Sequence, residues 1–103
     1  MKKTNLRNKK IKFSQHELNN IAEKFKVLSE PLRLAIIQFL MDGEKNVTDI
    51  HMALNSSQPN ISKHLKVLEQ AGFLNKEKHA VSVYYTIADP MVFKLCQLVC
   101  KNL

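Results

Sequence analysis

The segment between residues 47 and 74 constrains the fold of this chain more than any other part. Its first part, 47–54, is short and amphipathic, and a tight polar turn separates it from a longer amphipathic part, 58–71. The apolar residues that recur at helical spacing in the longer part are Ile61, Leu65 and Leu68. Two helices joined by such a turn have the layout of a helix-turn-helix, in which the second helix enters the major groove of DNA.

Local capping signals predict where the helices begin and end. Ser14 forms a capping box with Glu17, which starts the first helix. The residues expected to cap a helix N-terminus are Ser14, Ser29, Asn46, Ser57 and Asp89. The glycines expected to end helices are Gly43 and Gly72. Together these signals predict four helices before residue 73 and one after residue 89.

The pattern changes after the helix-turn-helix. Residues 73–77 and 81–87 are rich in β-forming side chains that roughly alternate, which predicts a hairpin joined through 78–80. A last helix is expected from about Pro90 to Asn102. The order α-α-α-α-β-β-α predicts a mainly α fold with a small β-hairpin. This is a winged helix-turn-helix, and we expect it as one domain over residues 13–103.

Positive charge is concentrated at the N-terminus. The first twelve residues carry six basic side chains and no acidic one, while the rest of the chain carries ten basic and nine acidic side chains. We expect residues 1–12 to be a disordered basic tail. Such a tail suits a polyanionic partner such as double-stranded DNA, because each neutralised phosphate releases counterions. A tail that only raises solubility is the alternative.

Signals for membrane insertion and for catalysis are missing from the sequence. No apolar run reaches the roughly 20 residues of a membrane span, and the basic N-terminus lacks the apolar stretch of a signal peptide. We therefore expect a cytoplasmic protein with no membrane partner. The four histidines show no HxxxH or HExxH spacing, and no glycine-rich phosphate loop is present. The sequence predicts no enzyme and no histidine metal site.

Several segments resemble one family of DNA-binding proteins. Residues 25–37 (FKVLSEPLRLAII) resemble the "ALSxPxRLxIL" motif of the ArsR/SmtB family of winged-helix repressors. Residues 57–68 (SQPNISKHLKVL) resemble that family's "SQxxxSxHLxxL" recognition helix, and 71–74 with 83–85 resemble its wing. The resemblance covers about residues 18–103. It implies a homodimer formed through the first and last helices, and a repressor that leaves its operator when an effector arrives.

The recognition helix and the wing carry the side chains expected to contact DNA. Gln58 and Asn60 lie in the first turn of that helix, and both amides can pair bidentately with adenine. Nearby serines, lysines and histidines suit contacts to phosphates or base edges. The complete predicted set is Ser56, Ser57, Gln58, Asn60, Ser62, Lys63, His64, Lys66, Lys76, Lys78 and His79.

Two cysteines form a second candidate site. Cys96 and Cys100 are four residues apart on the predicted last helix, so their side chains share one face. The two thiols could hold a thiophilic ion such as arsenite with a further ligand, or undergo oxidation or persulfidation. Either change would repack the last helix and release the operator. The alternative is that both cysteines are small hydrophobes in the dimer interface, with no cofactor bound.

The chain departs from the effector sites of the family that it resembles. Metal sensors of the family often carry "ELCVCDL", where residues 44–50 here (EKNVTDI) contain no cysteine. The family's last-helix zinc site begins Asp-x-His, whereas this chain has Asp89-Pro90-Met91. Residues 43–47 resemble the sulfide- and redox-responsive BigR-like branch. That branch pairs a second-helix cysteine with one in the last helix, and Gln38 takes the second-helix position here.

Functions of other classes stay open at this point. A winged fold can serve as a protein-interaction module, which would bind DNA weakly and without a specificity ratio. It can also be a DNA-binding module without an inducer, in which the cysteines are structural. A small thiol-redox enzyme would need an activated thiolate, but the C-terminal end of a helix disfavours negative charge.

Overall fold

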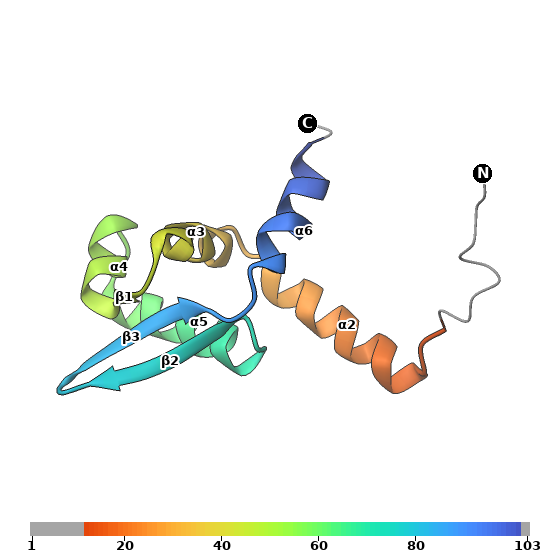
Figure 1. Ribbon diagram of the computed structural model, residues 1–103, viewed down its shortest axis with the longest axis horizontal. Coiled ribbons are helices and arrows are strands. Elements are labelled where there is room, and N and C mark those ends of the chain that lie inside the picture. Colours follow the sequence, from red (N-terminus) through yellow and green to blue (C-terminus); the bar gives the residue numbers. More distant parts are fainter. Residues whose placement is uncertain (1–11, 102–103) are drawn as a thin grey trace.

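The computed structural model describes residues 12–101. Of the predicted basic tail, 1–12, only Lys12 is described, and Asn102 at the predicted end of the last helix also lies outside this range. The elements are α2 (Gln15–Leu28), α3 (Pro31–Phe39), a 3₁₀ turn η1 (Leu40–Asp42), β1 (Lys45–Asn46), α4 (Val47–Ala53), α5 (Gln58–Gln70), β2 (Leu74–His79), β3 (Ser82–Ile87) and α6 (Met91–Cys100) (Figure 1). The predicted order of helices and hairpin strands is confirmed.

Three of the predicted N-cap residues cap their helices as expected. At α2 the Ser14 hydroxyl accepts the Glu17 N–H at 3.1 Å, and the Glu17 carboxylate accepts the Ser14 N–H at 2.8 Å. At α4 and α5 the side chains of Asn46 and Ser57 each accept the N–H three residues ahead, at 2.8 Å and 3.2 Å. These bonds satisfy N–H groups that the helix itself leaves unpaired, which fixes the start of each helix.

The prediction at Ser29 is wrong. Ser29 follows the end of α2, where its hydroxyl donates to the Lys26 carbonyl at 2.7 Å. Glu30 takes the capping position of α3 without a side-chain bond, and Pro31 opens the helix as expected. Ser29 therefore closes one helix instead of opening the next. Gly43 does lie where the second helical segment ends, after η1, with a positive φ of 132°.

The sheet differs from the predicted hairpin in two ways. Its order is β1-β3-β2, all antiparallel, and the short β1 pairs with Tyr84 and Tyr85 of β3. β1 is too short for a periodic signal, and it forms only because β3 offers a free edge. The hairpin turn also lies later than predicted, since β2 runs to His79 and the chain reverses at Ala80 and Val81. Ala80 adopts a left-handed φ of 56° there.

The hydrophobic core lies between α3, α4, α5 and the sheet. Ile61, Leu65 and Leu68 of α5 are fully buried, as their spacing predicted. The whole buried cluster comprises Leu28, Ile36, Ile37, Leu40, Ile50, Ile61, Leu65, Leu68, Leu74, Tyr85 and Val92. Within the described range, no helix is long and apolar enough to cross a membrane.

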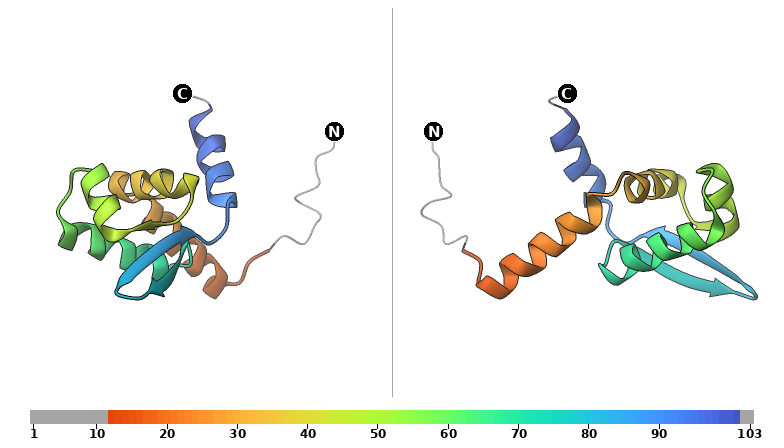
Figure 2. Two further views of the ribbon diagram at one scale, coloured as in Figure 1. Left: turned by 60° about the vertical axis from the view of Figure 1, so that its left-hand side comes forward. Right: turned by 180° about the vertical axis from the view of Figure 1, so that it is seen from behind.

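Helices α2 and α6 project away from this core (Figure 2). Each contributes one buried residue to it, Leu28 and Val92. Large apolar side chains elsewhere on these helices are exposed, including Phe25 at 54%, Leu98 at 62% and Val99 at 69%. The part of the molecule formed by α3, α4, α5 and the sheet (31–87) is called the winged part below, and it has a closed core. Helices α2 and α6 instead carry an uncovered apolar surface.

Candidate nucleic-acid interface

A tight turn of residues 54–57 sets the angle between α4 and α5. Asn55 adopts a left-handed φ of 54°, a conformation that asparagine tolerates better than most residues. The Ser56 N–H donates to the His51 carbonyl at 3.1 Å, and the His51 ring Nδ1 lies 3.2 Å from the Ser56 carbonyl oxygen. These bonds fix the turn, and the buried face of α5 then leaves its opposite face toward solvent.

The outer face of α5 carries a polar and basic stripe. Gln58, Ser62 and Lys66 are exposed and follow one another at intervals of four residues, which places them on one side of the helix. Lys63 is exposed beside them. An amide, a hydroxyl and two ammonium groups on the exposed face of a helix are suited to base edges and phosphates.

The other predicted residues at the start of α5 are engaged within the turn. The Asn60 side-chain amide donates to the Ser56 hydroxyl at 2.9 Å, and both residues are half-buried. The Ser57 hydroxyl accepts the Asn60 N–H as the helix cap. The side-chain carbonyl oxygen of Asn60 and the hydroxyl proton of Ser57 are not used in these bonds. The side chains of Ser56, Ser57 and Asn60 therefore stabilise the turn. The Asn60 oxygen and the Ser57 proton remain available for further hydrogen bonds.

His64 is buried and does not lie on the exposed face of α5. Its side chain is 7% exposed, and its Nδ1 accepts a hydrogen bond from the Arg33 Nε at 3.0 Å. Arg33 also donates to the Val27 carbonyl at 3.2 Å, so this pair connects α2, α3 and α5. Burial, followed by the positive charges of Arg33 and Lys63, lowers the pKa of His64 from its usual value, against a weaker opposite effect of Glu30. The ring is a neutral structural acceptor, and its placement does not support the predicted DNA contact.

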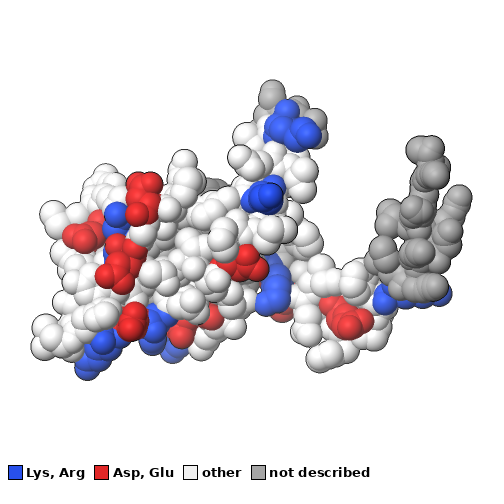
Figure 3. Space-filling model, in the orientation of Figure 1, with Lys and Arg blue, Asp and Glu red and all other residues white. Residues whose placement is uncertain are grey.

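The predicted wing residues divide between two faces of the hairpin. Lys76 and Lys78 share one face, where the Lys76 ammonium lies 3.8 Å from the Glu69 carboxylate of α5. His79 lies on the opposite face, with its Nε2 3.5 Å from the Glu77 carboxylate. In the space-filling view, basic side chains gather along the lower edge of the winged part, and acidic side chains lie on the surface beside it (Figure 3). The three wing residues therefore do not act as one cluster.

Both cysteines carry free thiols and border an apolar groove between α2, α3 and α6. Cys96 is half-buried, Cys100 is exposed, and the groove has a volume of about 660 Å³. Other side chains that line it are Phe25, Leu34, Gln38, Met41 and Phe93. Gln38 thus faces the same groove as the thiols. Residues of α2, α3 and α6 therefore surround Cys96 and Cys100, and the sequence alone could not show this.

This arrangement of a helix-turn-helix followed by a two-stranded wing defines the winged helix-turn-helix class of proteins. Among solved structures, the homodimeric winged helix-turn-helix DNA-binding domain Mb0332 from Mycobacterium bovis, described as a possible ArsR-family regulator, is similar with a TM-score of 0.78 and 26% identity. The similarity covers 90% of this chain and 92% of that one.

Sequence comparisons identify the family within this class. The family described as "Bacterial regulatory protein, arsR family" matches residues 30–76. The transcriptional repressor SdpR of Bacillus subtilis is 34% identical over 68% of this chain and 74% of its own length. A probable mercury resistance operon repressor of Streptomyces lividans is 31% identical over 75% of this chain, but the match spans only 62% of that relative. The chain belongs to the ArsR family.

Proposed function

We propose that this protein is a sequence-specific DNA-binding transcriptional repressor that acts as a homodimer. The observation that carries the proposal is the exposed stripe of Gln58, Ser62, Lys63 and Lys66 on a helix fixed by its buried opposite face. An α-helix presented in this way fits the major groove. Because its proposed partner is DNA, we expect the protein in the cytoplasm.

The residues divide into roles according to their chemistry. Gln58 and Ser62 would read base edges, with the Asn60 carbonyl oxygen as a further acceptor. Lysine side chains would contact phosphates, and so would set affinity and its dependence on salt. These lysines are Lys63, Lys66, Lys76 and Lys78, together with the basic residues of 1–12. The hydroxyls of Ser56 and Ser57 lie at the start of α5 and would contact the sugar-phosphate backbone of the DNA there.

The proposed dimer forms through α2 and α6. Phe25, Leu98 and Val99 expose apolar side chains that a second copy of the chain would cover. The groove that contains the two thiols lies between the same helices. The homodimeric state of the similar Mycobacterium bovis domain supports a homodimer here. A two-fold dimer would present its two α5 helices to major-groove segments roughly 34 Å apart on a palindromic site.

Fluorescence anisotropy with DNA from upstream of the protein's own gene tests the proposal. We expect tight binding that a scrambled duplex does not compete away. Gln58→Ala should weaken binding by about 1–3 kcal/mol and relax the preference at one base position. Gln70→Ala is the matched control, because it removes the same exposed side chain from the far end of α5.

Two results would contradict this proposal. If Gln58→Ala weakened binding to all duplexes equally, Gln58 would have no role in reading a base. Weak, salt-sensitive binding with no preference over the scrambled duplex would favour the protein-interaction module instead.

We further propose that Cys96 and Cys100 control release from the operator. Cys100 is exposed and Cys96 is half-buried in the groove, so a thiophilic ion such as arsenite, a persulfide donor or an oxidant could reach the two sulfur atoms. The same anisotropy assay, repeated with each reagent in turn, should show loss of binding with one of them, which would identify the chemistry of the response. Cys96→Ser combined with Cys100→Ser should bind DNA normally and no longer respond. A double variant that still responds would make the cysteines structural.

A further inference from the structure

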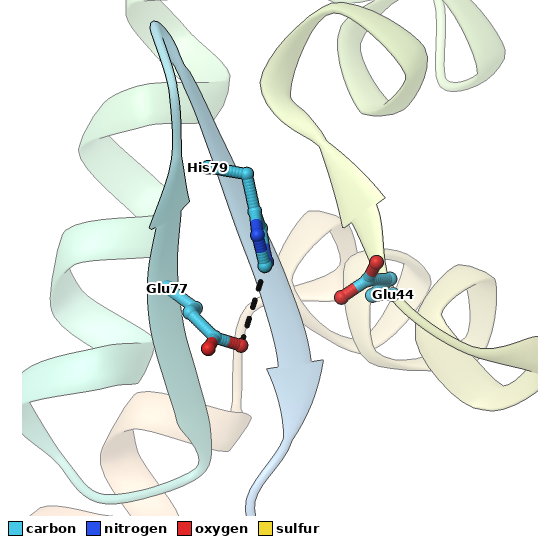
Figure 4. Close-up of side chains that lie close together, drawn as sticks. All are labelled: Glu44, Glu77 and His79. Atoms are coloured by element: carbon cyan, nitrogen blue, oxygen red, sulfur yellow. Dashed lines mark ion pairs between the residues drawn. The ribbon is translucent and has the colours of Figure 1, made fainter.

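Three side chains with metal-binding chemistry meet on one face of the sheet. Glu77 and His79 are two residues apart on β2, so they point to the same face. Tyr84 lies opposite Glu77 in the pairing of β2 with β3. Asn46 of β1 lies on the other side of Tyr84, and Glu44 precedes Asn46 by two residues. Glu44 directly precedes β1, and its carboxylate lies close to Glu77 and His79 on the same side of the sheet (Figure 4).

The distances among these groups suit a metal ion. One carboxylate oxygen from each glutamate and one ring nitrogen of His79 all lie within 4.8 Å of one another. A point at the centre of such a triangle is at most about 2.8 Å from each atom. Typical ligand bonds to zinc are about 2.0–2.2 Å, so the three exposed side chains need to close only slightly.

Contacts in the sheet already hold part of this arrangement. The His79 Nε2 lies 3.5 Å from the Glu77 carboxylate. The His79 ring packs edge-on against Tyr84, with centroids 5.2 Å apart and planes at 75°. The imidazole is therefore oriented by an aromatic neighbour on one side and directed toward a carboxylate on the other.

We infer that Glu44, Glu77 and His79 form a binding site for a divalent transition-metal ion such as Mn²⁺ or Zn²⁺. One imidazole and two carboxylates are ligands that both ions accept, and water would complete the shell because all three residues are exposed. The site lies on the wing and does not involve the two thiols. A bound ion would tie the wing to the segment that leads through β1 into α4, and would neutralise the two carboxylates.

Manganese is the sharper probe, because Mn²⁺ prefers carboxylates and imidazole whereas Zn²⁺ also binds thiolates. We propose to titrate the ¹⁵N-labelled full chain with MnCl₂ and to record the paramagnetic broadening of each amide signal. The expected result is saturable broadening centred on residues 44 and 77–79. Broadening centred anywhere else in the chain would overturn the site. The titration needs no DNA, so its failure is distinct from a failure of the proposed repressor function.

Two variants that each replace one proposed ligand test the site. Glu77→Gln and His79→Asn should each weaken Mn²⁺ binding by at least 10-fold. Glu23→Gln is the matched control, because it removes the same charge from an exposed position on α2 and should leave binding unchanged. Unfolding curves that superimpose on the wild type would show that each variant is folded. Equal Mn²⁺ affinity in Glu77→Gln and Glu23→Gln would overturn the assignment.

Discussion

The winged part of the molecule and the pair of helices α2 and α6 bury their apolar side chains to very different degrees. In the winged part, five residues of α3, α4 and α5 have no exposed surface at all: Ile36, Ile50, Ile61, Leu65 and Leu68. On α2 and α6, Phe25, Leu98 and Val99 are each more than half exposed. Both regions have strongly amphipathic helices, so the difference lies in what their apolar faces contact.

The comparison shows that this chain completes only one of its two hydrophobic surfaces by itself. Fully burying one large apolar side chain is worth about 1.5–3 kcal/mol, so an uncovered set of such residues favours association strongly. A short chain also buries a smaller share of its surface than a long one does. The winged part carries the residues proposed to contact DNA, and α2 with α6 carries the surface that a second copy would cover in the proposed dimer.

The largest expected effect is on the closed core. Leu65→Ala removes a side chain with no exposed surface, and the cavity should reduce the free energy of unfolding by about 2–5 kcal/mol. Met52→Ala is the control, because Met52 of α4 is 70% exposed and should change stability by about 0.5 kcal/mol or less. Urea unfolding monitored by circular dichroism measures both. Similar losses for the two variants would mean that the winged part is not a closed core.

The next effect concerns the open surface. Leu98→Glu would place a charge in the proposed dimer interface, and should weaken dimerisation by at least about 100-fold, or roughly 2.7 kcal/mol. Sedimentation equilibrium over a range of concentrations measures the dissociation constant. Val81→Glu is the control, since Val81 is 93% exposed at the turn between β2 and β3 and belongs to neither α2 nor α6. A Leu98→Glu variant that remains dimeric would move the interface to another surface.

Signals within one turn of helix were sufficient to predict much of the fold. The caps at Ser14, Asn46 and Ser57 and the buried spacing of α5 depend on neighbouring residues alone, and they are found where predicted. Ser29 shows the limit of such signals, because a serine between two helices can close one or open the other. Only the packed structure decides which role it takes.

Part of the candidate site could be predicted from the sequence in the same way. His64 follows Ile61 by three residues and precedes Leu68 by four, which is the spacing of the buried face, so its burial had a signal in the sequence. Its partner Arg33 had none, because the two residues are 31 positions apart. Glu44 and Glu77 were missed for the same reason. They meet only because β1 joins the sheet, and a two-residue strand leaves no periodic pattern.

His64 offers a test of how the closed core is joined to α2. The lowered pKa means that the unfolded chain takes up the proton first as pH falls. The free energy of unfolding should therefore fall below about pH 6.5, the ordinary value, and level off once the folded protein is also protonated. Above that pH this group contributes no pH dependence. Protonation also removes the acceptor of the Arg33 bond.

Urea unfolding at a series of pH values measures this dependence. His64→Asn keeps a side-chain acceptor near Nδ1 but cannot be protonated, so it should flatten the curve below pH 6.5. His16→Asn on exposed α2 is the control and should keep the wild-type curve. A wild-type stability that rises as pH falls through this range would contradict the lowered pKa.

The smallest expected effect lies at the wing turn, outside both surfaces. Ala80 is exposed and adopts a left-handed φ of 56°, which costs an L-residue roughly 1–2 kcal/mol but costs glycine little. Glycine loses more chain entropy on folding, so Ala80→Gly should stabilise the protein by only about 0.5–1 kcal/mol. The same substitution at Ala22, exposed within α2, should destabilise it by about 1 kcal/mol. Thermal unfolding of the two variants should therefore shift in opposite directions. A shift of the same sign would mean that the strain at Ala80 is relieved by contacts elsewhere in the wing.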